Sequence, residues 1–501
     1  MSSRLSGIIV AAGLAPAALY AAACDNLETL NTPTVHMTLA KSVDAGAFRL
    51  PEGTFRPPGA AVPFEKLPAF CRVGATLTPT ADSDIRAEIW LPQSGWNGKL
   101  LAVGSGGWGG AIGYDALAAA LSRGYAAVAS DDGHESQGAS FIVGHPQKLI
   151  DFAHRAEHEM TVEAKTLVKA FYGRAPSRSY WDGCSGGGRE GLLQAARYPE
   201  EFDGVVAGDP ADVRRNAWAL WLATQTFKDP AAHIPPAKYP MIHQAVLQSC
   251  DAQDGVKDGL ISEPERCHVD FRMLECKRGD APTCLTARQA QSARTIVSPL
   301  KSKSGETLFP RLEPGTELRW ARLVGGPDPA DLFLDQFRYG VYADPHWDWR
   351  TFDLERDAAR AHAVNKGVLE LDPHLSGFAQ RGGKLLIYHG WADQQVAPGA
   401  SVEFYEAAAR SSSKPAEAQS WIRLFMVPGM GHCSGGEGPD QFDALGALEH
   451  WVEQGKPPDR ILASHRSGGR VDRTRPLCPY PQVARYNGKG SIDDAANFAC
   501  R

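Results

Sequence analysis

After its N-terminal segment, the sequence lacks a long apolar run, a strong charge of one sign and closely paired cysteines. Because no stretch reaches about 18 apolar residues, we expect no membrane-spanning helix in the mature chain. The 52 Lys and Arg residues and the 58 Asp and Glu residues leave a formal net charge of −6, which argues against non-specific nucleic-acid binding. No two of the ten cysteines form a C-x-x-C pair, so a zinc site is not expected.

The composition is that of a globular chain. Hydrophobic residues at 43% and charged residues at 22% exclude disorder over most of the 501 residues. The 51 glycines and 35 prolines predict many turns and not a helical bundle or coiled coil. The length allows one large domain with an insertion, or two to three domains.

Residues 1–23 have the pattern of a signal peptide. Arg4 gives a positive start, an apolar stretch of small residues follows, and three alanines at 21–23 offer a cleavage site. A transmembrane anchor is one alternative, although Pro16 and the shortness of the run count against it, and a lipid-modified Cys24 is another. Scattered cysteines in even number imply disulfides in an exported chain. We therefore predict a secreted or periplasmic protein.

Short apolar runs alternate with segments of helical spacing along two parts of the chain. The runs are typical of buried strands, and they cover residues 99–103, 126–130, 179–182, 204–207, 384–388 and 422–427. Strands that alternate with helices predict an α/β fold with a parallel sheet.

The alternation stops over residues 211–371, a segment rich in Trp, Pro and Asp that holds four of the ten cysteines. A long insertion between two core strands costs little by loop closure alone. We therefore predict a catalytic domain formed by residues 24–210 and 372–501, with residues 211–371 as an inserted lid domain.

Three turns that follow predicted strands carry a serine, an aspartate and a histidine. Ser185 lies in Gly-Cys-Ser-Gly-Gly, a G-x-S-x-G match between a strand and a helix, which is the setting of a nucleophile elbow. Asp393 and His432 each follow a later strand. The chain order Ser, Asp, His is that of α/β-hydrolases, in which the histidine takes the serine proton and the aspartate orients the histidine. We predict an α/β-hydrolase core with these three catalytic residues, and Asp209 and Asp212 as rivals for the acid.

Two cysteines adjoin these residues, since Cys184 precedes Ser185 and Cys433 follows His432. A disulfide between them would tie the nucleophile to the base, with Cα atoms about 5–6 Å apart. Such a bond fits an oxidising compartment, in agreement with export.

A Gly-rich loop at residues 104–110 also follows a predicted strand. In an α/β-hydrolase, one oxyanion-hole donor is the backbone N–H after the nucleophile, here that of Gly186, and the other comes from such a loop. We predict Gly107 as the second donor, with Gly106 as the alternative. A plain flexible loop is a further interpretation, and nucleotide binding is disfavoured because no G-x-G-x-x-G spacing or Walker lysine follows.

Asp251, Asp254 and Asp258 place three carboxylates within eight residues, and Gly255 and Gly259 allow tight turns. Hard oxygen ligands packed in a turn suit Ca²⁺, so we expect a structural calcium ion in the lid segment. A solvated Asp-Gly turn is the alternative, because the spacing departs from that of an EF-hand.

Four motifs resemble the tannase and feruloyl esterase family, which includes the mono(hydroxyethyl) terephthalate hydrolases. They are GCSGGGREG (183–191), DAQDGVKDGL (251–260), HGWAD (389–393) and GMGHC (429–433). The resemblance extends from Cys24 to the C-terminus. It implies a secreted serine esterase that acts on aromatic acid esters and carries calcium in its lid.

The resemblance also implies ligands and cysteine pairs. It adds the backbone carbonyls of Val256 and Leu260 to the calcium shell. It implies five disulfides, which are Cys184–Cys433, Cys24–Cys71, Cys250–Cys267, Cys276–Cys284 and Cys478–Cys500.

The leading functional hypothesis is a feruloyl esterase or tannase that forms an acyl-enzyme. Hydrolysis of terephthalate half-esters or other small aromatic esters is the alternative. A calcium-stabilised binding module without activity is disfavoured, because the serine, aspartate and histidine are all present. Trp108 and His389 are candidate substrate-pocket residues, with a place in the core as the alternative for each. The motifs leave the acyl group, the alcohol and the oligomeric state open.

Overall fold

The computed structural model describes residues 23–52, 54, 63–136, 138–412 and 415–501. Apart from Ala23, the predicted signal peptide at residues 1–23 lies outside the described residues. None of the described helices is long and apolar enough to cross a membrane.

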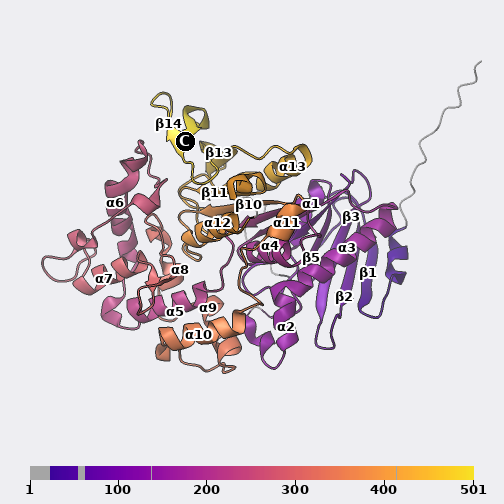
Figure 1. Ribbon diagram of the computed structural model, residues 1–501, viewed down its shortest axis with the longest axis horizontal. Coiled ribbons are helices and arrows are strands. Elements are labelled where there is room, and N and C mark those ends of the chain that lie inside the picture. The colour runs from indigo at the N-terminus through magenta and orange to yellow at the C-terminus, as the bar shows by residue number, and fades with distance from the viewer. Residues whose placement is uncertain (1–22, 53, 55–62, 137, 413–414) are drawn as a thin grey trace, which may run out of the picture.

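A nine-stranded sheet runs through the described chain in the order β1-β2-β3-β5-β4-β6-β7-β10-β11 (Figure 1). Neighbours from β5 to β11 are parallel, whereas β1, β2 and β3 pair antiparallel with their neighbours. The strands are β1 (Val35–Val43), β2 (Phe70–Leu77), β3 (Ile85–Pro92), β4 (Lys99–Val103), β5 (Ala126–Ser130), β6 (Arg178–Cys184), β7 (Gly204–Gly208), β10 (Lys384–Gly390) and β11 (Ile422–Val427). All six predicted strands lie in the parallel part.

Helices cover both faces of the sheet, which explains why its central strands are apolar at consecutive positions. In β4, Leu100 and Ala102 belong to the core on one face, and Leu101 and Val103 to the core on the other. The first face carries α3 (Ala156–Tyr172), α4 (Gly186–Arg197) and α12 (Gly399–Ser411), and the second carries α1 (Tyr114–Ser122) and α13 (Ala444–Gln454). Two short helices, α2 (Pro146–Ile150) and α11 (Ser376–Gln380), complete this part.

As far as the chain is described, the segment between β7 and β10 adds no strand to this sheet. Its apolar residues form a separate core that includes Trp218, Trp320 and Phe337. Its helices lie together beside the sheet (Figure 1). A second core thus forms within residues 211–371, and its role as a lid stays a prediction. The elements are α5 (Arg215–Thr226), α6 (Tyr239–Cys250), α7 (Ala287–Ile296), α8 (Ala321–Val324), α9 (Asp331–Asp335), α10 (Leu354–Asn365), β8 (Leu300–Lys301) and β9 (Thr307–Phe309).

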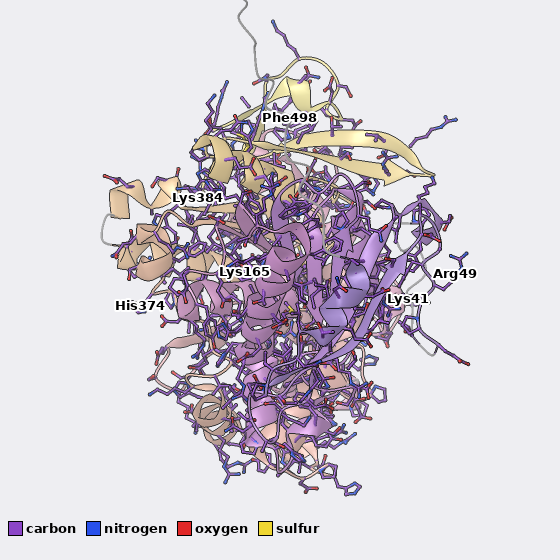
Figure 2. The ribbon with its side chains drawn as sticks, turned by 90° about the vertical axis from the view of Figure 1, so that its right-hand side faces the viewer. Lys41, Arg49, Lys165, His374, Lys384 and Phe498 are labelled. Atoms are coloured by element: carbon purple, nitrogen blue, oxygen red, sulfur yellow. A yellow bond between two sulfur atoms is a disulfide. The ribbon has the colours of Figure 1, made fainter. Side chains whose placement is uncertain are left out.

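The C-terminal segment reaches this inserted segment. It consists of the hairpins β12 (Ile461–Ser467) to β13 (Arg470–Leu477) and β14 (Ala484–Tyr486) to β15 (Phe498–Cys500). Nη2 of Arg475 donates to Oδ2 of Asp258 at 2.5 Å, and the guanidinium lies 3.7 Å from the ring centroid of Phe498. Figure 2 shows Phe498 and Lys384, the first residue of β10, in the upper part of the molecule. Between the two hairpins, the N–H of Tyr480 donates to the carbonyl of Leu424 in β11 at 2.7 Å. The C-terminal segment therefore contacts both the predicted calcium loop and the sheet.

All ten cysteines are paired, and no cysteine is free. The bridges join the pairs that the family resemblance implies. They are Cys24–Cys71, Cys184–Cys433, Cys250–Cys267, Cys276–Cys284 and Cys478–Cys500.

Helix α4 lies so close to β6 that Gly191 has no room for a side chain. A Cβ at Gly191 would lie 2.5 Å from Cδ1 of the fully buried Trp181. We predict that Gly191→Ala lowers the free energy of unfolding by about 1–3 kcal/mol through overpacking. Gly113→Ala is the control, because its nearest neighbour would lie 3.7 Å away, and it should change stability by less than about 0.5 kcal/mol. Chemical denaturation of both variants measures the difference, and equal stabilities would contradict the prediction.

Candidate active site

The chain turns from β6 into α4 at a single residue, Ser185. Its backbone has φ 62° and ψ −115°, a region that strains a residue with a side chain. The Ser185 N–H donates to the carbonyl of Gly208 at 2.9 Å, and the Ala211 N–H donates to the carbonyl of Ser185 at 2.9 Å. Both partners lie at or after the end of β7, so the neighbouring strand holds the elbow.

Glycines let α4 approach the ends of the strands. A Cβ at Gly183 would lie 2.6 Å from the carbonyl carbon of Gly187, and a Cβ at Gly187 would lie 3.0 Å from Cα of Gly104. The N–H of Gly187 also donates to the carbonyl of Ser105 at 2.7 Å. The motif glycines therefore bring the elbow against the loop that follows β4.

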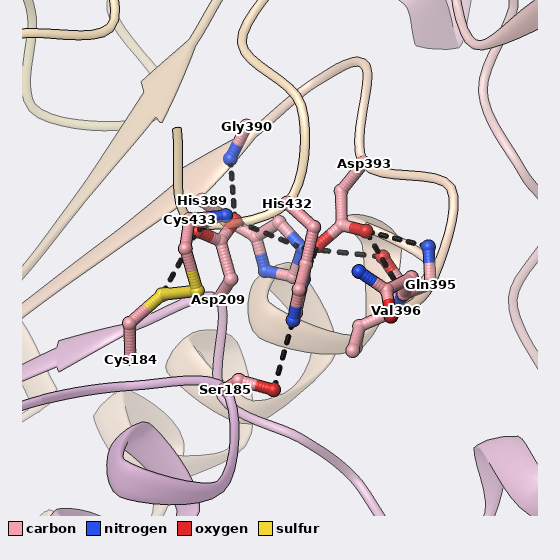
Figure 3. Close-up of a disulfide and its surroundings, with 10 residues drawn as sticks. All are labelled: Cys184, Ser185, Asp209, His389, Gly390, Asp393, Gln395, Val396, His432 and Cys433. Atoms are coloured by element: carbon pink, nitrogen blue, oxygen red, sulfur yellow. Dashed lines mark hydrogen bonds and ion pairs between the residues drawn. A yellow bond between two sulfur atoms is a disulfide. The ribbon is translucent and has the colours of Figure 1, made fainter. Parts of the chain in front are cut away.

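The predicted serine, histidine and aspartate form a hydrogen-bonded row (Figure 3). Oγ of Ser185 is 2.8 Å from Nε2 of His432, and Nδ1 of His432 is 2.6 Å from Oδ2 of Asp393. Oδ1 of Asp393 accepts the backbone N–H groups of Gln395 at 2.6 Å and Val396 at 3.0 Å. The ends of β6, β10 and β11 thus place the three side chains, and the backbone after β10 orients the carboxylate.

The carboxyl group of Asp393 favours its ionised form. The residue is fully buried, and burial alone would raise the pKa of this carboxyl. The charges of His432 and His389 and the hydrogen bonds from them outweigh burial and hold the pKa of Asp393 well below its usual range. An ionised Asp393 can stabilise positive charge on His432 when the histidine accepts a proton.

The two rival aspartates have other partners. Asp209 is fully buried, and it accepts the backbone N–H of Gly390 at 2.8 Å and that of Cys433 at 2.9 Å. Burial raises the pKa of Asp209 to about 6. Asp212 accepts Nε of Arg214 at 2.8 Å. Asp209 therefore joins the turns that carry Asp393 and His432 by hydrogen bonds. The sequence does not reveal this role, because it depends on contacts between turns that are far apart along the chain.

His389 corrects one expectation, because it does not face a substrate pocket. Its exposed fraction is 0%. Nδ1 lies 2.7 Å from Oγ of Ser401, and Nε2 lies 3.2 Å from Oδ2 of Asp393 and 3.2 Å from the carbonyl of Val396. The imidazole therefore supports Asp393 from within the protein interior.

Cys184 and Cys433 form a disulfide beside the hydrogen-bonded row (Figure 3). Their Cα atoms are 6.0 Å apart, although 249 positions separate the residues along the chain. Cys433 has φ 62°, which is uncommon for a residue with a side chain. The bond holds the turn after β6 to the turn after β11, and with them Ser185 to His432.

The Gly-rich loop at residues 104–110 lies against the elbow. The backbone nitrogen of Gly107 is 3.4 Å from the Cβ position at Gly186, and Gly107 has φ +63°. Within the loop, the N–H of Gly109 donates to the carbonyl of Gly106 at 3.0 Å. The two predicted N–H donors therefore belong to adjacent backbone segments next to Ser185.

A small cavity beside Gly107 combines aromatic and cationic side chains. Nε1 of Trp108, a predicted pocket residue, donates to the carbonyl of Leu332 at 3.0 Å. Within the described chain, Nη1 of Arg215 and Nε and Nη2 of Arg189 are buried without a hydrogen-bond acceptor. Burial lowers the pKa of Arg215 to about 10, so it stays charged at neutral pH. The cavity is lined by Gly107, Trp108, Phe152, Arg189, Arg215 and Leu332, among others.

The predicted calcium loop is folded around its aspartates. Oδ1 of Asp251 accepts the backbone N–H of Asp258 at 3.0 Å. Oδ2 of Asp254 is buried without a hydrogen-bond partner among the described residues, and burial raises the pKa of Asp254. A cation would satisfy that oxygen. Asp258 already has a cationic partner in Arg475, so the donor set fits calcium most clearly at Asp254.

The family described as tannase and feruloyl esterase matches residues 71–325 and 334–501. The chain belongs to this family. One relative is an esterase of Xanthomonas campestris pv. campestris, which is 37% identical over 96% of this chain and 91% of the relative. Another is a probable feruloyl esterase B of Aspergillus clavatus, which is 33% identical over 98% of this chain and 97% of the relative.

Solved structures agree with this membership. Feruloyl esterase B from Aspergillus oryzae matches with a TM-score of 0.89 and 31% identity over 95% of this chain and 99% of that chain. Tannin acyl hydrolase from Aspergillus niger shares the fold, with a TM-score of 0.76 and 21% identity over 94% of this chain and 92% of that chain. The α/β-hydrolase fold and the family resemblance are therefore confirmed, and the protein is a carboxylic ester hydrolase.

Replacing Cys184 and Cys433 together with alanine should lower kcat more than it changes KM. Without the bond the two turns lose their covalent tie, and a displacement near 1 Å can cost about 10²-fold in rate. Steady-state kinetics on an aromatic ester measures this effect. The control is the double variant Cys276→Ala with Cys284→Ala, which removes a bridge between residues only 8 positions apart. Equal losses of kcat in the two double variants would argue against a special role for the first bridge.

Proposed function

We propose that the protein is a serine esterase that cleaves esters of aromatic acids through an acyl-enzyme. The observation that carries this proposal is the hydrogen-bonded row from Ser185 Oγ through His432 to Asp393. In this mechanism His432 takes the Ser185 proton as Oγ attacks the ester carbonyl, and Asp393 stabilises the resulting imidazolium.

The backbone N–H groups of Gly186 and Gly107 would donate to the carbonyl oxygen as it becomes negative. His432 then gives its proton to the leaving alcohol, and the acyl group stays on Ser185. Water attacks the acyl-enzyme with His432 as the base, which releases the acid and restores the serine. Throughout, the Cys184–Cys433 bridge holds the turn of the nucleophile to the turn of the base.

The side chains that line the cavity beside Gly107 support the proposal of an aromatic acyl group. The rings of Trp108 and Phe152 lie there with centroids 5.2 Å apart, and Leu332 of the inserted segment lines the same cavity. Aromatic side chains of this kind favour contact with a planar ring. The relatives named feruloyl esterase B point to a phenolic acid as the acyl component.

A second candidate is the hydrolysis of aromatic half-esters that carry a free carboxylate, such as those of terephthalate. The buried guanidinium groups of Arg189 and Arg215 favour it, because both line the cavity and both have nitrogen atoms without an acceptor in the described chain. A carboxylate on the substrate would supply the missing acceptor.

A structural calcium ion in the inserted segment is part of the proposal. The buried oxygen of Asp254 without a partner supports it, as does the Cys250–Cys267 bridge that closes the loop. A bound cation would offset the repulsion between the carboxylates, and no catalytic step needs it. The ligands would be the side chains of Asp251, Asp254 and Asp258 and the carbonyls of Val256 and Leu260.

Export completes the proposal. The pairing of all ten cysteines supports an oxidising compartment, and the chain would therefore be secreted or periplasmic.

Ser185→Ala should remove the esterase activity and leave the fold intact. Triad residues act as a unit, so the loss of kcat should be about 10⁴-fold or more. Rates on methyl ferulate, methyl gallate and a terephthalate half-ester would be measured for the wild type and the variant, with circular dichroism as the check on folding. An active variant would refute the mechanism. Among the three substrates, preference for the half-ester would favour the second candidate.

Removal of calcium should lower thermal stability. An ion that binds only the folded chain stabilises it by about 2.7 kcal/mol at a hundredfold excess over Kd. We therefore expect EDTA to lower Tm, and Asp254→Ala to lower Tm and raise KM with a smaller effect on kcat. Asp270→Ala is the control, because this carboxylate of the same segment is exposed and paired with Arg272. If EDTA leaves Tm unchanged and metal analysis finds no calcium, the predicted calcium loop is only a solvated Asp-Gly turn.

A further inference from the structure

Three buried carboxyl groups lie behind the Gly-rich loop, apart from the hydrogen-bonded row. Asp132 follows β5, Glu157 lies in α3 and Glu190 lies in α4. Their exposed fractions are 2%, 1% and 0%, and one carboxyl oxygen of each lies within 4.8 Å of the others. Three acids this close and this buried cannot all be ionised without a large electrostatic cost.

The carboxyl groups contact the loop on both sides of Gly107, at Ser105 and at Gly109. Oγ of Ser105 lies 2.5 Å from Oδ2 of Asp132 and 2.7 Å from Oε1 of Glu190, and the Ser105 N–H donates to Oε2 of Glu190 at 3.0 Å. On the other side, a Cβ at Gly109 would overlap Oδ2 of Asp132. The position of the Gly107 N–H therefore depends on these carboxyl groups.

The two short contacts of the Ser105 hydroxyl point to a proton in this cluster of carboxyl groups. The Ser105 hydroxyl has one hydrogen, so it can donate to only one of the two carboxyl oxygens beside it. If the second contact is also a hydrogen bond, the other oxygen carries a hydrogen of its own. Each acid has one further donor, the Ser130 hydroxyl for Asp132 at 3.3 Å and the Ser105 N–H for Glu190 at 3.0 Å. Glu190 is the better proton holder because it is fully buried beside the charge of Asp132, and both effects raise its pKa.

We propose, on the basis of the serine esterase function above, that Glu190 keeps a proton and positions the oxyanion loop through Ser105. Oε1–H of Glu190 donates to Oγ of Ser105, and the Ser105 hydroxyl donates to an ionised Asp132. Glu190 and Asp132 are then positioning residues, since they act on the substrate through the backbone N–H of Gly107.

The charges around the cluster favour this proton. Burial and the charge of Asp132 raise the pKa of Glu190 to about 7, and the pKa of Glu157 is raised well above its usual range by burial and by the charges of Asp132 and Glu190. Arg189 is the facing cation, with Nη2 at 3.7 Å from Oε1 of Glu190. Burial lowers the pKa of His134, which faces Asp132, so it adds no charge at neutral pH.

The arrangement makes the position of the oxyanion loop sensitive to a rise in pH through neutrality. A raised pKa means that the folded protein binds the proton more tightly than the unfolded chain does. The proton is therefore in place at low pH and is lost as the pH rises through about 7, the pKa of Glu190. Its loss puts a second charge beside Asp132, so the loop should shift and kcat should fall more than KM changes.

Glu190→Gln tests the proposal, because its amide is neutral at every pH. Its Nε2 can donate to Oγ of Ser105, and its Oε1 can accept the Ser105 N–H. With methyl ferulate, or whichever ester the wild type cleaves fastest, we expect kcat at pH 6 to stay within about threefold of the wild type. Between pH 6 and pH 8, the kcat of the wild type should fall relative to the kcat of this variant. The general-base role of His432 is common to both proteins and cancels in this ratio.

Two further variants separate positioning from folding. Glu190→Ala should lower kcat by about 10²-fold with a smaller change in KM, as expected when an oxyanion donor is misplaced. Ser105→Ala keeps the backbone N–H bond to Glu190 and loses the proton chain, so it should lower kcat by less, about tenfold. If Glu190→Ala does not fold, the kcat of Ser105→Ala serves as the test of loop positioning.

The proposal is overturned if the kcat of Glu190→Gln is as low as that of Glu190→Ala. The same result is expected if the three carboxylates hold a cation in place of the proton. The proposal is overturned as well if the ratio of wild-type kcat to Glu190→Gln kcat stays constant between pH 6 and pH 8. In both cases a wild type that cleaves esters and an inactive Ser185→Ala would leave the serine esterase function standing. A wild type that cleaves none of the esters would instead remove that function.

Discussion

The left-handed turn at Ser185 is the constraint on which the rest of the site depends. A strand can give way to a helix at one residue only where the surrounding backbone compensates for the strain. Gly208 and Ala211 supply the hydrogen bonds, so β7 must lie directly beside β6. Gly183 and Gly187 supply the space. The position of Ser185 is therefore set by the parallel sheet and by the first residue of the inserted segment, Ala211.

The histidine is held by two forces of different kinds. A covalent bond joins its neighbour Cys433 to the elbow, and the buried carboxylate of Asp209 accepts the N–H of the same cysteine. Asp209 and Asp393 both lie close to His389, yet their pKa values move in opposite directions. For Asp209 burial dominates, whereas two histidines outweigh burial at Asp393. Environment, and not residue type, separates Asp393, which hydrogen-bonds His432, from Asp209, which accepts backbone N–H groups.

Much of the fold and of the hydrogen-bonded row could be predicted from sequence, because parallel strands are continuous apolar runs and Ser185, Asp393 and His432 each follow one. The antiparallel strands β1 to β3 were missed because their apolar pattern is interrupted, as in β1, where buried and exposed positions mix. The pocket role of His389 was wrong, since local sequence does not reveal which way a residue beside the acid faces. The clusters around Asp209 and Glu190 join turns distant in sequence, and no local pattern encodes them.

The Cys184–Cys433 bridge also makes the middle of the chain a closed ring. Everything between those two cysteines, including the whole inserted segment, β7 and β10, lies on one covalent loop whose ends are 249 positions apart in the sequence. A protease that cuts once within the inserted segment would open the ring without separating the two halves, because the sulfur–sulfur bond still joins them. In a nascent chain the ring is still open, because Cys433 follows β11 and the bond can form only after β11 has been made. Until then, the serine turn exists without its histidine, and an exported chain would acquire its complete site only as the last strand of the sheet is added.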